Sequence, residues 1–487
     1  MHYLLDDRSV SWLRTLLFCG DRKKATWAIV GLLVGLALVG GALLVFLTPV
    51  GGLAVILAGL CALLMLRDVR WGLLALVAVI GLLPFASLPI KLGFTPTFLD
   101  LVLGALYAVW GIRLVTRQQH DLVLTPIGVP VLVFIALALF SFVMGLAHSR
   151  PTANDLRTFC EVVLGFGIFF VVVNNVRDQV LLRQLTASLV LVGAGESAVG
   201  ILFYVLPTAW TVRLLNPLGR LGYPVGLGAL RYINDDPTRP MRAIGTNVDP
   251  NILGAMLVVI LCLAGVQLVA RRPALPRGVL ALSVGLMGVC LFLTYSRSSM
   301  FGVLVALGII ALLRYRRLFL LLLAAGLLLI LLPQTQAYIA HLVQGIEIAD
   351  RSTQMRMGEY KDAFELIRRY PWIGVGFVGT PDIDLYLGVA SLYLTLAAQM
   401  GIIGLLSFCI VAVASIAYML RAWRVSRADA SLEPLLLGYL AAVLGSLVSG
   451  LLDHTLLTYP HAVALLWLTL GLGIASARTA ILARESQ

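Results

Sequence analysis

Three arginines and one histidine could carry phosphate chemistry in a chain that is otherwise poor in charge. Arg242 lies just before a predicted helix, Arg297 in a short turn between two apolar runs, and Arg356 in a later polar segment. Guanidinium groups bind phosphate oxygens through two parallel hydrogen bonds and need no metal to do so. His454 follows Asp453, and a neighbouring carboxylate can orient an imidazole and raise its basicity. We therefore expect an anion site made by the arginines, with His454 as general base and Arg297 also assisting the reaction.

Each of these residues also has a purely structural interpretation. An arginine at the membrane boundary costs up to about 3 kcal/mol unless it snorkels or pairs, so Arg297 could be a snorkelling anchor. Arg242 could be a solvated loop charge, and Arg356 could pair with Glu359 one helical turn later. The histidine and its neighbouring aspartate could cap two short helices. Weaker candidates for the base are His461, Glu347, Glu359 and Asp382.

The segment around the third arginine is predicted to be an amphipathic helix followed by a loosened turn. Apolar residues at helical spacing, such as Met355 and Phe364, lean to one side. Pro371 ends the helix, because its ring restricts the preceding residue and removes an amide donor. Gly374 and Gly376 can then lay backbone amides against a ligand. We expect a helical lid over the site, with both glycines among the substrate-binding residues.

Composition assigns the chain to the polytopic membrane proteins. Of 487 residues, 60% are apolar and only 12% are charged, and apolar runs of about 20 residues recur along the chain. Since backbone polar groups in lipid must be satisfied internally, and the runs lack the alternation of barrel strands, the spans are helices. We predict an all-α fold of about 12–14 transmembrane helices. The apolar runs lie near residues 26–47, 50–66, 71–90, 94–115, 125–146, 159–173, 185–206, 251–270, 280–295, 300–313, 318–332, 392–420, 435–452 and 462–477.

The expected layout alternates helical bundles with two long outer segments. Residues 1–25 form a cytoplasmic amino-terminal tail, 26–206 the first transmembrane helices, and 207–249 the first long extracytoplasmic loop. Residues 250–332 return to the membrane, and 333–388 form the second long extracytoplasmic loop with the amphipathic helix. Residues 389–477 are the last transmembrane helices, and 478–487 a cytoplasmic tail.

The distribution of basic residues predicts the orientation. With both termini cytoplasmic, most of the 36 lysines and arginines fall on short inner loops and tails, as the positive-inside rule requires. Apart from the two long outer segments, only Lys91, Arg150, Arg157 and Arg297 remain outside. The net charge of +12 therefore reflects membrane topology, and we expect no nucleic-acid partner.

The remaining polar residues give weaker signals. No cysteine falls in the long outer segments and no Cys/His cluster has metal spacing, so we expect neither metal nor cofactor. Arg157 and Glu161 are one turn apart and could pair, although Arg157 could instead bind the phosphate of a substrate. Asp100 is placed to cap a helix, and Asp249 can cap the helix that has Pro250 in its first turn. Glu196 lies deeper among small residues, where it could contact another helix or line a cavity.

An ordered set of motifs resembles a known family. The motifs run Arg242-x-x-Gly245-Thr246-x-x-x-Pro250-Asn251, Tyr295-Ser296-Arg297-Ser298, then Arg356, Ala363, Pro371 and Gly374-x-Gly376, then Tyr393-Leu394 and Gly401-x-x-Gly404. In order and spacing they resemble the O-antigen ligase and O-antigen polymerase superfamily of membrane glycosyltransferases. The resemblance spans most of the carboxy-terminal two-thirds of the chain, whereas the first helices match only in hydropathy.

The resemblance implies a metal-independent glycosyltransferase that moves glycan from an undecaprenyl diphosphate carrier on the outer face of a bacterial inner membrane. A chain-length regulator and a flippase are the candidate protein partners. Ligases of the family typically carry His-Asn just before the Tyr-Leu pair, where this chain has Ala390 and Ser391. This difference favours a polymerase of surface polysaccharide repeat units over a ligase that attaches glycan to a lipid A-core or other acceptor.

A second class of function also fits the number of helices. A transporter of lipid-linked glycan or of small solutes would have a similar number of spans, but it should place ionisable residues near the middle of the bilayer. Apart from Glu196 the spans contain few such residues, and the charges with functional spacing gather on one face. The pattern favours chemistry on the outer face.

Overall fold

The computed structural model describes residues 64–331 and 351–485, except residues 66, 89–92, 117–121, 148, 381–387 and 428. The chain divides into two units, Met1–Leu63 and Leu64–Gln487, and the description below concerns the second. The predicted amino-terminal tail, the span at 26–47 and nearly all of the span at 50–66 lie outside the described residues, as do Glu347 and Asp382.

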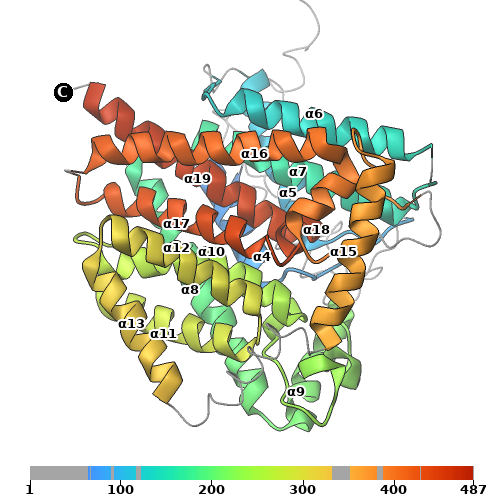
Figure 1. The fold of residues 1–487 in the computed structure, drawn as a ribbon. Helices are drawn as coiled ribbons and strands as arrows, with labels where there is room; N and C mark the ends of the chain where they lie inside the picture. Colours follow the sequence, from blue (N-terminus) through green and yellow to red (C-terminus); the bar gives the residue numbers. More distant parts are fainter. Residues whose placement is uncertain are drawn as a thin grey trace, which may run out of the picture. The chain divides into compact units, whose positions relative to one another are not determined.

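The described part of the chain is all-helical, as predicted, and contains no β-strand (Figure 1). Seven of its helices are long and apolar enough to cross a membrane: α5 (Phe98–Val115), α6 (Gly128–Gly145), α7 (Ala153–Asn175), α8 (Gln179–Val205), α10 (Pro250–Val269), α16 (Leu392–Ser426) and α19 (Pro460–Glu485). Four apolar helices are shorter: α4 (Val69–Leu82), α11 (Arg277–Leu293), α12 (Arg297–Leu313) and α17 (Glu433–Ser449). With α13 (Arg316–Leu331), every predicted apolar run from Trp71 onwards corresponds to a helix.

Two helices form the centre of this bundle. Of the apolar 18-residue stretch of each helix, 89% is buried in α10 and 78% in α19, whereas only 22% is buried in α5. A helix that is apolar around its whole circumference is suited to such a central position. α10 contacts α8, α11, α12 and α17, while α19 contacts α7, α16 and α17. Polar groups also link the bundle, since the hydroxyls of Thr186 on α8 and Tyr439 on α17 lie 2.7 Å apart.

The irregular segments lie at helix ends. Between α8 and α10 come α9 (Thr208–Leu215) and four 3-10 turns: η1 (Asn216–Leu221), η2 (Gly226–Ala229), η3 (Ile233–Asp235) and η4 (Gly245–Asn247). The predicted lid helix is α15 (Arg351–Arg369), which ends two residues before Pro371 as expected. A single turn, α18 (Thr455–Thr458), precedes α19.

The predicted apolar side of α15 is only partly buried. Ala363, at the same helical spacing, is buried, but Met355 and Phe364 are 54% and 61% exposed. The helix also packs through Leu366, which is buried against Val375 and Ala398. Helical spacing gave the right element and part of its buried side, because the packing partner is a kinked part of α16 that periodicity alone does not reveal.

Candidate functional site

The loop that carries Arg242 is held by a buried carboxylate. Glu196, on α8, is fully buried and accepts hydrogen bonds from the Thr246 amide (2.6 Å), the Thr246 hydroxyl (2.9 Å) and the Asn247 side-chain amide (2.9 Å). Gly245 has φ +55°, and a Cβ at this position would overlap the Glu196 carboxylate. The Gly-Thr pair of the first motif thus lets the loop close onto α8.

Arg242 is oriented by the start of α10 and the end of α11. Its Nε donates to the Thr294 carbonyl at 2.8 Å, and its Nη2 donates to the Asn251 side-chain oxygen, also at 2.8 Å. Asp249 caps α10 by accepting from the Asn251 and Ile252 amides at 2.7 and 3.2 Å, as predicted. Arg242 is therefore part of a built hydrogen-bond network, which argues against a merely solvated loop charge.

Arg297 occupies the first position of α12, between serines that point inward. Ser296, Ser298 and Ser299 are all buried and their hydroxyls lie near one another, with Ser296 Oγ 2.9 Å from Ser299 Oγ. The Arg297 Nη2 instead donates to the Thr353 hydroxyl on α15 at 3.3 Å. The Ser-Arg-Ser spacing thus anchors the helix start and directs the arginine towards the lid helix.

Tyr295 has an unusual backbone. Its φ of +54° is in the left-handed region, which a bulky residue adopts only when its surroundings enforce it. Burial, together with the neighbouring Tyr204, raises the pKa of Tyr295 to about 12, so the phenol stays neutral at physiological pH. The strained turn presents a neutral aromatic side chain beside Arg297.

A backbone interlock joins the end of α15 to a break in α16. The break is at Gly401, with φ +69°, and the Pro371 carbonyl accepts from the Ile402 amide at 2.7 Å. In the other direction, the Val375 and Gly376 amides donate to the Ala398 and Gln399 carbonyls, both at 2.9 Å. A Cβ at Gly401 would overlap the Trp372 backbone, so this close approach requires glycine.

This interlock corrects one expectation about the glycine turn. Gly374 and Gly376 do adopt positive φ, at +73° and +88°, as a loosened turn requires. Their amides, however, donate to the carbonyls of Tyr370 and Gln399, so they are not turned towards a ligand. Neither glycine lines the cavities described below. The turn clamps the carboxyl end of the lid helix, and both of its glycine amides are already used within the chain.

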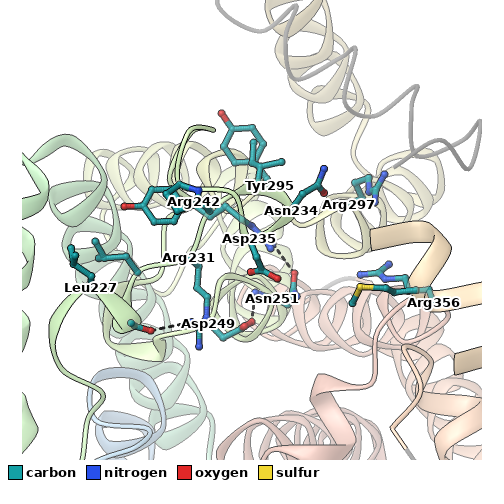
Figure 2. Close-up of a pocket in the computed structure, with 16 residues that line it drawn as sticks. Leu227, Arg231, Asn234, Asp235, Arg242, Asp249, Asn251, Tyr295, Arg297 and Arg356 are labelled. Atoms are coloured by element: carbon teal, nitrogen blue, oxygen red, sulfur yellow. Dashed lines mark hydrogen bonds between the residues drawn. The ribbon is translucent and has the colours of Figure 1, made fainter. Parts of the chain in front are cut away.

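The three predicted arginines line one cavity, which we call the arginine cavity. It has a volume of about 750 Å³, and its polar lining is Arg231, Tyr232, Asn234, Asp235, Arg242, Asp249, Asn251, Tyr295, Arg297 and Arg356. In Figure 2, Arg297 and Arg356 come from α12 and α15, and Arg231 and Arg242 come from the loop before α10. Segments more than a hundred residues apart thus bring four guanidinium groups and two carboxylates to one place.

A smaller cavity, the His454 cavity, adjoins the arginine cavity. It measures about 260 Å³ and is lined by Asp249, Asn251, Met355, Arg356, Glu359, Ala390, Asp453, His454, Thr455 and Tyr459. Four of these, Asp249, Asn251, Met355 and Arg356, also line the arginine cavity. His454 therefore approaches the arginines from another turn of the chain, and Arg356 faces both compartments.

The structure gives Asp453 a different role from the predicted one. Its carboxylate accepts from the Thr455 amide at 2.8 Å and from the Thr455 hydroxyl, and its other oxygen is 3.5 Å from Ser298 Oγ. His454 Nδ1 instead lies 2.8 Å from the Thr458 hydroxyl. Asp453 thus holds the first residue of α18 and contacts the start of α12, while the imidazole lies against a threonine of α18.

Glu359 and Ala390 connect the lid helix to the start of α16. The Glu359 carboxylate accepts from the Ala390 amide at 3.0 Å, and the Tyr360 hydroxyl donates to the Ala390 carbonyl at 3.2 Å. Burial raises the pKa of Tyr360, which keeps it a neutral donor. Ala390 stands where ligases of the resembled family carry histidine, and it lines the same cavity as His454.

Arg157 is not brought to either cavity. Its Nη1 lies 2.9 Å from Asp100 and 3.1 Å from Glu161, and Thr97 bonds to both carboxylates. Asp100 also completes the capping box of α5, as predicted. These contacts favour the pairing interpretation of Arg157 over a phosphate contact.

His461, which was a weaker candidate for the general base, lies away from both cavities. His461 is buried at the start of α19, with its ring 4.9 Å from that of Phe85. It does not line the cavities that hold the arginines and His454.

Comparison with protein families gives a match to the part of the chain that carries Arg297 and Arg356. Residues 282–409 match the family model described as O-antigen ligase. Over this segment the chain is similar to the O-antigen ligases. This confirms the resemblance seen in the motifs and places the segment in a superfamily of membrane glycosyltransferases. A comparison with curated protein sequences gave no match.

The matched segment contains only part of the site. Arg297, Arg356 and Glu359 lie inside it, whereas Arg242 and His454 lie outside and join it through α10 and α18. Arg231 was not predicted as a site residue. The long loop before α10 carries several arginines, and only folding selects which of them faces the cavity.

Proposed function

We propose that this protein transfers glycan from an undecaprenyl diphosphate carrier to a hydroxyl acceptor at the arginine cavity, on the outer face of a bacterial inner membrane. The supporting observation is the convergence of Arg242, Arg297 and Arg356, from three separate segments, on one cavity at the starts of α10 and α12. The segment similar to the O-antigen ligases supplies two of the three.

The chemistry needs a strong anion site. When the bond between the sugar and the diphosphate breaks, negative charge builds up on the leaving oxygens. Fixed guanidinium groups stabilise that charge through paired hydrogen bonds, and a cavity partly shielded from water strengthens the interaction. Helix starts at Pro250 and Arg297 add positive electrostatic potential in the same place. Four arginines against two carboxylates leave a net positive cavity, so this transfer can proceed without a metal.

We assign the general base to His454. His454 Nδ1 lies 2.8 Å from the Thr458 hydroxyl. In the tautomer in which Nδ1–H donates to that hydroxyl, Nε2 is the basic nitrogen, and it takes the proton of the acceptor hydroxyl as that oxygen bonds to the sugar carbon. The diphosphate carrier leaves with the electrons of the broken bond. Ala390 supports this assignment, because it lines the cavity of His454 and stands where family ligases carry their histidine. Glu359, in the same cavity, is the alternative base.

Within the superfamily we favour a polymerase of polysaccharide repeat units, with a ligase as the alternative. The absence of His-Asn at Ala390 and Ser391 is the reason. A transporter is less well supported, because the buried Glu196 holds the Thr246 loop in place by hydrogen bonds. Both termini would be cytoplasmic, and a chain-length regulator or flippase would be a natural partner.

The test is elongation of a synthetic lipid-linked repeat unit by the purified protein in nanodiscs, without nucleotide or divalent metal. A ladder of longer lipid-linked glycans supports the polymerase. Product formed only when a lipid A-core or another acceptor is added would assign a ligase. No new glycosidic bond with either acceptor, by a protein that retains its thermal unfolding transition, would overturn the proposal.

A further inference from the structure

A second arginine cavity lies at the opposite ends of the helices that carry the first. α10 and α12 begin at the arginine cavity and end at Val269 and Leu313. At those ends is a cavity of about 400 Å³, lined by Val269, Arg271, Arg314, Tyr315, Arg316, Arg317, Ala430, Glu433 and Pro434. A helix of 20 residues, such as α10, spans about 30 Å, which is the thickness of the hydrocarbon core. The two groups of arginines therefore lie near opposite membrane surfaces.

The one carboxylate in this cavity is already engaged. Glu433 is only 5% exposed, and its oxygens accept from Arg314 Nε at 2.7 Å and Arg314 Nη2 at 3.2 Å. The indole of Trp423, on α16, also donates to Glu433 at 3.2 Å, and Arg427 stacks over that indole at 4.4 Å. This network fixes one wall of the cavity and neutralises Arg314.

Three further arginines supply the net charge. Arg271 follows α10, and Arg316 and Arg317 begin α13, so two separate loops bring them together. All three are exposed, and within the described residues none forms an ion pair. Tyr315 also lines the cavity, and burial raises its pKa, which keeps it a neutral hydrogen-bond donor.

Positive charge at this membrane surface is expected from topology alone, because cytoplasmic loops are rich in arginine. Topology alone does not explain why arginines that follow α10 and begin α13 line one cavity. It also does not explain why one wall of this cavity is fixed by the hydrogen bonds of Glu433. We infer that this cavity binds the phosphate headgroup of an anionic phospholipid in the leaflet opposite to the glycan-transfer site. Basic cavities between helices at the cytoplasmic surface suit such headgroups, and arginine matches phosphate bidentately.

The test measures binding of fluorescent phosphatidylglycerol to the protein in phosphatidylcholine nanodiscs. The test variant combines Arg271→Gln, Arg316→Gln and Arg317→Gln. A direct hydrogen bond to a charged phosphate contributes roughly a factor of ten in affinity, so the triple variant, which removes three guanidinium partners from the cavity, should bind at least about 100-fold more weakly. The matched control combines Arg272→Gln, Arg421→Gln and Arg424→Gln, which removes equal charge from exposed residues at the same end of the bundle but outside the cavity.

We expect the control variant to retain phosphatidylglycerol binding and the test variant to lose it. Equal weakening of both variants would reduce the effect to general surface attraction and overturn the site. Displacement of the lipid by millimolar inorganic phosphate would overturn the lipid assignment in favour of a soluble anion. If the triple variant lacks a thermal unfolding transition, the single substitutions of the exposed Arg316 and Arg317 give the same comparison, each with an expected loss of about ten-fold against a smaller loss in Arg421→Gln.

Discussion

Substitution of Glu196 tests whether the arginine cavity depends on a residue that does not line it. Glu196 accepts three hydrogen bonds from Thr246 and Asn247 at 2.6–2.9 Å in a fully buried position. In Glu196→Ala the Thr246 amide and the Asn247 side-chain amide lose their acceptor, at about 1–3 kcal/mol each, or roughly 2–6 kcal/mol together. The lower end already corresponds to about a thirty-fold change in the equilibrium between docked and undocked loop.

Glu196→Gln is the matched control. Its carbonyl oxygen can keep the two amide donors, and its amide can donate to the Thr246 hydroxyl, which reverses its role from donor to acceptor. We expect Glu196→Ala to lower kcat/KM for lipid-linked repeat elongation at least ten-fold and to expose a cysteine placed at Thr246 to an aqueous thiol reagent. Glu196→Gln should remain within a few-fold of the wild type. Wild-type elongation by Glu196→Ala would refute the argument that this carboxylate positions Arg242.

Four further predictions follow from named contacts. Arg297→Lys should lower kcat/KM for elongation about 10- to 100-fold with an unchanged unfolding temperature, because an ammonium cannot replace a planar fork; wild-type kinetics would remove Arg297 from the anion site. His454→Ala should lower kcat by roughly 10²- to 10⁴-fold with little change in KM for the carrier, and a second substitution, Ala390→His, should restore part of the rate because both positions line one cavity. Near-normal elongation by His454→Ala would assign the proton to another group. Arg157→Ala should destabilise the protein by about 3–5 kcal/mol, because it leaves two carboxylates without their partner; a lower unfolding temperature with a normal KM in the remaining folded protein is the expected pattern. Arg272→Cys should react with a membrane-impermeant thiol reagent only from the cytoplasmic side, and labelling from outside would reverse the predicted topology.

Hydropathy and charge were sufficient to predict the helices, and the motifs were sufficient to predict which arginines come together. Apolar runs map onto helices from α4 to α19 because a bilayer requires long apolar segments with internally satisfied backbones. Pro371 ended the lid helix as expected, and Asp249 and Asp100 cap helices as expected. These features depend on local sequence, so local rules capture them.

The wrong predictions concern the directions of side chains and their hydrogen-bond partners. Adjacency suggested that Asp453 orients His454, yet the two side chains contact different threonines, because successive residues at a helix start point apart. The glycine turn was correctly located, but its amides are used by the break at Gly401, which lies some 25 residues away in sequence. Glu196 was recognised as an unusual residue, but its partner Thr246 was not predicted. Only folding brings that loop to Glu196.

Arg356 and Asn251 face the arginine cavity and the His454 cavity at the same time. A ligand in one cavity that reorients Arg356 changes the hydrogen-bond donors that line the other cavity. Binding in the two cavities is therefore coupled. Such coupling is reciprocal: the factor by which carrier binding alters acceptor affinity equals the factor by which the acceptor alters carrier affinity. If the protein elongates glycan as proposed, this linkage acts on whether the grown chain leaves after one addition or stays for the next, and substitution of Arg356 is expected to change the distribution of product lengths.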